Sequence, residues 1–155
     1  MFNLKDFYTD GEPSKETVEA VTEGWKTVTP EEIKKWDADV FSEHWYRIYE
    51  AIGKVITEEQ FLAIIDNYNK YASEDRGEDK YLYEIFEGAR LFEEVHKHIE
   101  DVDLEHGAED CTIVFKTPFN TYYSQRRNGN YDWCYYNELV QVKPVTKEIT
   151  VYEKI

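Results

Sequence analysis

The sequence has few cysteines and no long apolar run, and both absences restrict the kinds of protein it can be. Its 155 residues include only Cys111 and Cys134, too few for the disulfide framework of a small secreted domain. No stretch approaches the ~18 apolar residues that a membrane-spanning helix requires. Residues 1–10 lack the apolar core of a secretory signal peptide. These absences predict a soluble protein of the reducing cytoplasm.

Positive charge is also scarce, with 18 Lys and Arg against 33 Asp and Glu and a net charge of −15. A field of that sign repels nucleic acids and anionic membranes, so direct binding to either is not expected. A basic protein is the partner that such a charge favours. Acidity that serves only to keep a protein soluble remains the alternative.

Signatures of catalysis are missing as well. The chain has no glycine-rich phosphate loop, no Ser-His-Asp pattern and no zinc-ligand spacing. We therefore expect no catalytic residue, no cofactor and no metal. A small enzyme that uses Cys111 or paired carboxylates is the alternative, and it would require a deep pocket with converging polar groups.

Hydrophobic residues make up 41% of the chain and aromatic residues 16%, enough for a folded protein despite its charge. The length fits one domain over residues 1–155. Apolar residues recur with helical spacing over residues 1–110 and alternate over residues 111–155. The pattern predicts an α+β fold, in which an N-terminal bundle of about four helices precedes an antiparallel sheet of four to five strands.

Three capping signals mark predicted helix starts. Ser14 precedes a helix to about Glu23, and Thr29–Glu32 and Thr57–Gln60 are capping boxes. A long fourth helix is predicted from about Lys80 to Ile99, with its apolar residues facing inward. The residues expected to be buried are Trp36, Trp45, Ile48, Phe61, Ile65, Ile85, Phe86, Phe92, Ile113 and Phe115.

Two hairpins are predicted after Cys111. Asn128-Gly129 is a strong signal for a tight turn between residues 119–125 and 131–136. A second hairpin would pair Leu139–Lys143 with Glu148–Glu153.

The acidity is confined to the predicted helical part. Residues 1–110 contain 29 Asp and Glu and 12 Lys and Arg, a balance of −17, while residues 111–155 contain 4 and 6, a balance of +2. The boundary stretch, Glu100–Asp110, holds six carboxylates and no Lys or Arg. We predict that three acidic clusters bind the partner: Glu12, Glu16, Glu19 and Glu23; Glu74, Asp75, Glu78 and Asp79; and Asp101, Asp103 and Glu105.

The histidines and the acidic stretch do not predict a metal site. On a helix, His96 and His98 would point about 200° apart and could not share an ion. Asp101, Asp103 and Glu105 alternate as in a calcium-binding loop, but Thr112 stands where the terminal glutamate is required. A solvated acidic loop is the favoured interpretation.

The sheet region offers two further candidates. Arg126 and Arg127, at the predicted hairpin tip, could hold a phosphate or a carboxylate, but solvated turn residues are the favoured interpretation. The hairpin is rich in aromatic residues, and one of its two faces should be free to bind protein. Tyr123, Trp133 and Tyr135 represent that surface, with a plain cross-strand aromatic ladder as an equal alternative.

Together these features favour a non-enzymatic acidic binding protein. Rows of carboxylates can imitate the phosphates of a nucleic acid, so the leading hypothesis is a stoichiometric inhibitor of a nuclease or other nucleic-acid-binding enzyme. In charge and size the chain is similar to phage anti-CRISPR and antirestriction proteins and to immunity proteins against nuclease toxins. An adaptor that binds protein through the aromatic hairpin is the remaining alternative.

Overall fold

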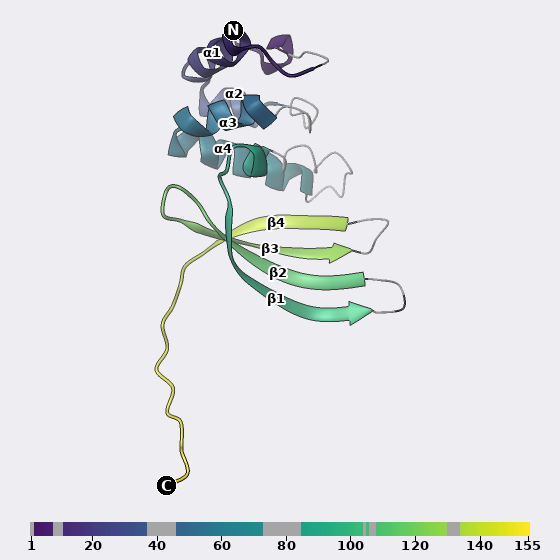
Figure 1. Cartoon of the computed structure of the whole chain (residues 1–155), viewed down its shortest axis with the longest axis vertical. Coiled ribbons are helices and arrows are strands. Elements are labelled where there is room, and N and C mark those ends of the chain that lie inside the picture. The colour runs from purple at the N-terminus through teal and green to yellow at the C-terminus, as the bar shows by residue number, and fades with distance from the viewer. Residues whose placement is uncertain are drawn as a thin grey trace.

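The computed structural model of the chain describes residues 2–7, 11–36, 46–72, 85–103, 105, 108–129 and 134–155. Figure 1 shows the helices in successive layers above one edge of a sheet, so the predicted α+β class is confirmed, although the helices do not form a clear bundle. The elements are η1 (Leu4–Phe7), α1 (Lys15–Trp25), α2 (Pro30–Lys34), α3 (Tyr46–Val55), α4 (Glu58–Ala72), β1 (Glu93–Asp103), β2 (Ala108–Lys116), β3 (Tyr122–Gly129) and β4 (Cys134–Val142).

The three predicted capping signals are confirmed, whereas the predicted start of the fourth helix near Lys80 lies outside the described residues. The Ser14 hydroxyl accepts a hydrogen bond from the Thr17 N–H at 3.2 Å at the start of α1. Thr29 and Glu32 form a complete capping box before α2. Such side chains stabilise a helix because they satisfy backbone N–H groups that have no partner within its first turn.

Helix α4 is the layer that joins the other helices to the sheet (Figure 1). Its Gln60 caps the helix, because the side-chain oxygen accepts from the Thr57 N–H at 3.0 Å. The same oxygen accepts from the Trp25 indole N–H at 3.0 Å, and the Gln60 amide donates to the carbonyls of Trp25, the last residue of α1, and Val28. Farther along α4, Asn67 donates to the carbonyls of Ile33 and Trp36 at the end of α2. Buried amides on α4 therefore fix the positions of α1 and α2.

The predicted helix over residues 80–99 is wrong from Ala89 onward. Residues 85–88 are helical, but Arg90 adopts a positive φ of 56°. The N–H of Leu91 donates to the Phe86 carbonyl at 2.8 Å, and the N–H of Arg90 donates to the Glu87 carbonyl at 3.0 Å. These two bonds are a Schellman motif, which ends the helix and turns the chain into β1. This helix end could not be predicted from the sequence, because a residue with positive φ at a helix end is usually glycine and here is Arg90.

The sheet is antiparallel in the order β1-β2-β3-β4, and it begins at Glu93, earlier than the predicted Cys111. The strand count agrees with the predicted four to five. Asn128 and Gly129 do not form the predicted turn, because both lie within β3 and pair with Tyr135 and Cys134 of β4.

The second predicted hairpin does not form. Residues 143–155 continue from β4 as an extended segment that leaves the body of the molecule (Figure 1). Its expected partner edge on β4 is occupied by α4. The Asn69 amide donates to the Leu139 carbonyl at 3.0 Å, and its oxygen accepts from the Leu139 N–H at 2.8 Å.

The core lies between α4 and the inner face of the sheet, which is the face toward the helices. The Phe61 ring packs against Phe86, Phe92, Phe119 and Tyr123, with centroids 5.3 to 6.2 Å apart. Among the residues predicted to be buried, Trp36 and Phe92 are half-buried and Trp45 lies outside the described residues. The others are buried, namely Ile48, Phe61, Ile65, Ile85, Phe86, Ile113 and Phe115.

No helix within the described ranges has both the length and the apolar character needed to cross a membrane.

Candidate interaction site at the end of the sheet

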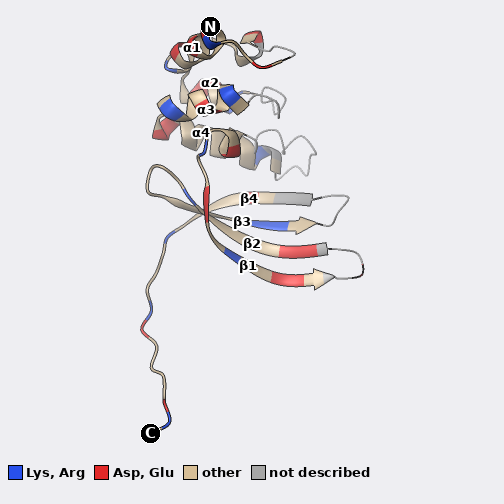
Figure 2. Cartoon of the chain, in the orientation of Figure 1, with Lys and Arg blue, Asp and Glu red and all other residues tan. Residues whose placement is uncertain are grey.

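The acidic stretch Glu100–Asp110 forms the far end of the β1–β2 hairpin. In Figure 2 the ends of these two strands are red, away from the point where β1 leaves the helices. Asp101 is the partner of Asp110, and Asp103 is the partner of Ala108. A stretch predicted to be a solvated loop is therefore mostly paired strand, which places carboxylates on two adjacent strands. We call this region the acidic hairpin end.

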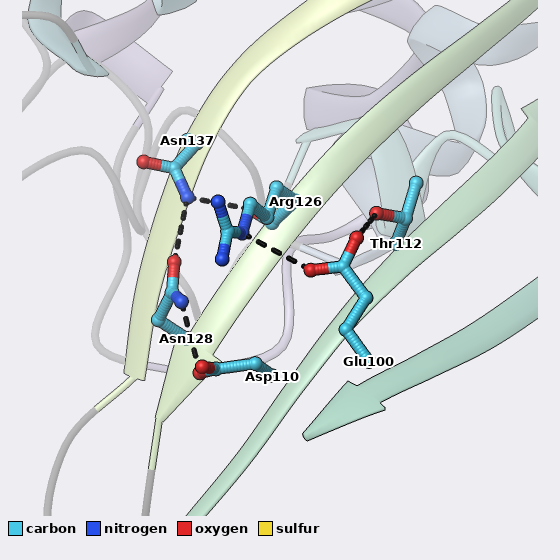
Figure 3. A network of polar contacts seen from close by, with 6 residues as sticks. All are labelled: Glu100, Asp110, Thr112, Arg126, Asn128 and Asn137. Atoms are coloured by element: carbon cyan, nitrogen blue, oxygen red, sulfur yellow. Dashed lines mark hydrogen bonds and ion pairs between the residues drawn. The ribbon is translucent and has the colours of Figure 1, made fainter.

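The outer face of the sheet, which is the face away from the helices, carries a polar network that reaches the acidic hairpin end (Figure 3). Glu100 of β1 accepts a hydrogen bond from the Thr112 hydroxyl at 2.9 Å and lies 3.4 Å from the Arg126 Nε. Asn137 of β4 donates to the Asn128 oxygen at 3.0 Å, and Asn128 donates to Asp110 at 2.9 Å. The network therefore links all four strands and orients two of the carboxylates.

On the inner face, one further carboxylate of the acidic hairpin end has a basic partner. The Lys97 Nζ lies 2.9 Å from the Glu109 carboxylate. This hydrogen bond, together with the negative charge of Glu109, raises the pKa of Lys97 above the ordinary lysine value. Both side chains are partly exposed, so the pair contributes little to stability.

Asp101 is the least compensated carboxylate among the described side chains of this region. It is exposed, and no ion pair or hydrogen bond of its side chain is found within the described ranges. It also faces Asp110 directly across the β1–β2 ladder. Like charges in that arrangement destabilise a sheet by a few tenths of a kcal/mol, up to about 1 kcal/mol. The fold therefore keeps a small cost in stability at this solvent-facing position.

The predicted cluster on α1 is exposed but largely compensated. Glu12 precedes the helix and is paired with Arg47 of α3. Glu19 lies 4.0 Å from Lys15, and Glu23 lies 2.9 Å from Lys26. Glu16 is exposed. The carboxylates of α1 are thus interleaved with basic side chains, whereas those of the acidic hairpin end are more concentrated.

The remaining predicted acidic residues divide into two groups. Glu105 is exposed, and Asp103 lies at the end of β1 although its side chain is not described. Glu74, Asp75, Glu78 and Asp79 lie outside the described residues.

The predicted aromatic surface is corrected at Tyr123. Only 3% of this residue is exposed, because it lies on the inner face of β3 and packs against Phe61 and Phe92. Burial raises the pKa of its phenol, and the nearby carboxylates Asp66 and Glu58 raise it further. Trp133 and the side chain of Tyr135 lie outside the described residues.

The two histidines are placed differently from the helical expectation. His96 and His98 lie on strand β1 opposite Val114 and Thr112, so they share the outer face of the sheet. The two imidazoles therefore do not point about 200° apart, as a helix would require. In the part of the chain that the structure describes, no three His, Cys, Asp or Glu side chains are grouped to hold a metal ion.

The two arginines lie within β3, two and three residues before its end, and they serve different faces. Arg126 joins the outer polar network, as described above. The Arg127 Nε donates to Gln125 at 3.1 Å, and its guanidinium lies 5.5 Å from the centre of the Phe115 ring on the inner face. Sequence reasoning missed the network of Thr112, Arg126, Asn128 and Asn137, because its register depends on β1 being a strand.

The described hollows are shallow surface features. One of them, about 670 Å³, is lined by Thr112, Arg126, Asn128 and Asn137 of the polar network and by Ala72 at the end of α4, among others. Cys111, the candidate nucleophile, is buried on the inner face of β2, with 5% of its surface exposed.

Comparison of the chain with protein-family models, with curated proteins and with solved structures gave no match in any of the three.

Proposed function

We propose that this protein is a non-enzymatic binding protein that acts in the cytoplasm on a basic protein partner, and that the acidic hairpin end is its main contact surface. The observation that carries the proposal is the set of carboxylates held in two adjacent strands, with Asp101 directly opposite Asp110. Such a surface attracts a basic partner over a distance and orients it on approach.

The arrangement of these carboxylates favours one class of basic partner. Side chains on the same face of a strand repeat every ~6.5–7 Å, and facing residues of paired strands lie ~4.5–5.5 Å apart. Negative charges held on paired strands at these spacings resemble the charges of a nucleic-acid backbone more closely than scattered surface acids do. We therefore propose that the partner is a nuclease or another nucleic-acid-binding enzyme, and that this chain occupies its phosphate-binding groove as a stoichiometric inhibitor.

The polar network also supports the proposal, because it holds two carboxylates in place before a partner binds. Glu100 is held by Thr112 and Arg126, and Asp110 is held by Asn128. Carboxylates fixed in this way lose less side-chain entropy on binding than long flexible ones.

A charge-reversal experiment tests the proposal. The first variant changes Asp101, Asp103 and Glu105 to Lys, and the matched control changes Glu16, Glu19 and Glu23 of α1 to Lys. Both alter the net charge by the same amount. Each protein is immobilised and exposed to lysate at low and at high salt, and captured nucleic-acid-binding enzymes are then assayed for inhibition by the purified variants.

The hairpin variant is expected to lose capture and inhibition, while the α1 control keeps most of both and both variants keep their melting temperatures. A third variant, with Glu74, Asp75, Glu78 and Asp79 changed to Lys, tests the remaining acidic cluster. Equal behaviour of all the variants and the parent protein would contradict the proposal and leave solubility as the role of the acidity.

A further inference from the structure

The exposed large apolar residues of this protein are concentrated in two segments. Eight of the eleven in the described ranges lie either on β1 or in residues 143–155. Those on β1 are Val95, Ile99 and Val102, and those of the second segment are Val145, Ile149, Val151, Tyr152 and Ile155. Exposed apolar side chains scattered singly need no explanation, but a concentration of this kind marks an interaction surface.

The first segment, β1, is an uncovered sheet edge. It is 11 residues long, its one partner strand in the described ranges is β2, and each of its described side chains is exposed. An edge strand presents a row of backbone N–H and C=O groups that another strand can pair with. Register shifts interrupt β1 between Glu94 and His96 and between Ile99 and Asp101, which leaves the regular run His96–Ile99 as the centre of the available edge.

The second segment, residues 143–155, is extended like a strand but is not part of the sheet. Val145, Ile149, Val151 and Ile155 fall on one, mainly apolar side of an extended chain, together with Lys147 and Glu153, and Thr146, Glu148, Thr150 and Tyr152 fall on the other. From Lys143 onward the segment is extended and exposed, with Tyr152 93% exposed. A strand with one apolar side is stable only when that side is covered.

Charge decides which edge suits this segment. Residues 93–103 contain five Asp and Glu and one Lys, a balance of −4. Two copies of β1 would therefore repel each other if they paired. Residues 143–155 contain three Lys and two Glu, a balance of +1, so this segment is attracted to β1. The edge of β4 is unavailable, because Asn69 occupies both backbone groups of Leu139 there.

We propose that residues 143–155 of one chain add as a fifth strand to β1 of a second copy, and that reciprocal exchange of these strands forms a twofold dimer. Reciprocal exchange uses both open edges and both free strands and leaves none to recruit a further copy. The apolar side of the added strand covers Ile99 and Val102, which lie on the inner face of the sheet. This inference is independent of the proposed function.

Light scattering with size-exclusion chromatography gives the mass in solution, and hydrogen exchange reports on the β1 amides. The parent protein is expected to be a dimer with protected amides across His96–Ile99. A donor variant, Ile149→Lys with Val151→Lys, is expected to raise the dimer dissociation constant about 100-fold or more and to remove the protection of the β1 amides that point away from β2. The control, Leu62→Lys, changes an exposed apolar residue of α4 and should leave the dimer intact.

Mixing separates strand exchange from other modes of association. An acceptor variant, Ile99→Lys with Val102→Lys, should also be monomeric, and circular dichroism verifies that both variants remain folded. Because each variant keeps the half that the other lacks, an equimolar mixture should form a heterodimer through one remaining interface. A monomeric parent protein would overturn the proposal, whether its β1 amides are protected by its own segment or not at all. A dimer that survives both variants would overturn it as well.

Discussion

The two edges of the sheet are treated in opposite ways. At the β4 edge, α4 lies alongside the strand, and the Asn69 amide bonds both backbone groups of Leu139 as a neighbouring strand would. At the β1 edge the described side chains are exposed, two register shifts interrupt the strand, and charged residues line it. The contrast shows two solutions to one problem, because an unprotected edge recruits other strands. One edge is covered by a helix, and the other carries a negative charge that prevents it from pairing with a second copy of itself.

The difference extends to the energetics. Next to α4 the sheet is held by buried aromatic packing and by side-chain amides that replace missing strand bonds. Toward β1 it is held by partly exposed ion pairs such as Lys97 with Glu109. Exposed pairs contribute little, so the stability of the fold should reside mainly at the covered side, and binding should use the open side. The following variants test that division.

The largest effect is expected at Phe86. This residue is fully buried, stacks on Phe92 at 4.6 Å between ring centroids and meets Tyr68 at 5.9 Å. Phe86→Ala should lower the free energy of unfolding by ~3–5 kcal/mol in urea titrations. Ile99→Ala, at a residue 49% exposed, should cost less than ~1 kcal/mol in dilute solution. A loss below ~1 kcal/mol at Phe86 would mean that the covered side is not where the stability resides.

A smaller loss is expected when the β4 edge is uncovered. Asn69→Leu keeps a similar volume but leaves the N–H and the C=O of Leu139 without their partner, at a cost of ~1–3 kcal/mol. Asn69→Asp keeps the acceptor for the Leu139 N–H and loses only the donor. Its free energy of unfolding should therefore lie between those of the parent protein and Asn69→Leu. Hydrogen exchange at Leu139 should accelerate in the same order. Unchanged stability in both variants would show that solvent replaces the amide without cost.

On the open edge, the expected change has the opposite sign. Asp101→Asn removes one charge of the facing pair with Asp110 and should raise the free energy of unfolding by ~0.2–1 kcal/mol at low salt. The gain should shrink as salt is added. Glu16→Gln on α1 makes the same change in net charge and is the control. An equal gain at Glu16 would assign the effect to the overall charge of the protein.

The sequence predicted the fold class, the three capped helix starts and most of the buried residues, because these depend on local patterns. It failed where tertiary contacts override such patterns. Arg90 ends a helix in a conformation that usually requires glycine, and Asn69 occupies the edge that the second hairpin needed. Both errors concern the sheet edges. The acidic stretch could therefore be identified from its composition, but its place on two paired strands could not be predicted. Its polar network follows only from the strand register.

The smallest effect concerns Tyr123, which lies on β3 between the two edges. Burial raises the pKa of its phenol above the ordinary tyrosine value, and Asp66 and Glu58 raise it further. The folded protein therefore keeps the phenol proton at pH values where the unfolded chain has lost it. The resulting contribution to stability is complete below about pH 10, the ordinary tyrosine pKa, and is lost as the pH rises through the raised pKa of the folded state. Tyr123→Phe should flatten the alkaline fall in unfolding free energy and leave its pH dependence near pH 7 unchanged. Tyr152→Phe, at a residue 93% exposed, is the control and should not alter that alkaline fall. If both variants flatten the curve equally, the interior position of Tyr123 does not control its proton, and the burial of the inner face of β3 would have to be reconsidered.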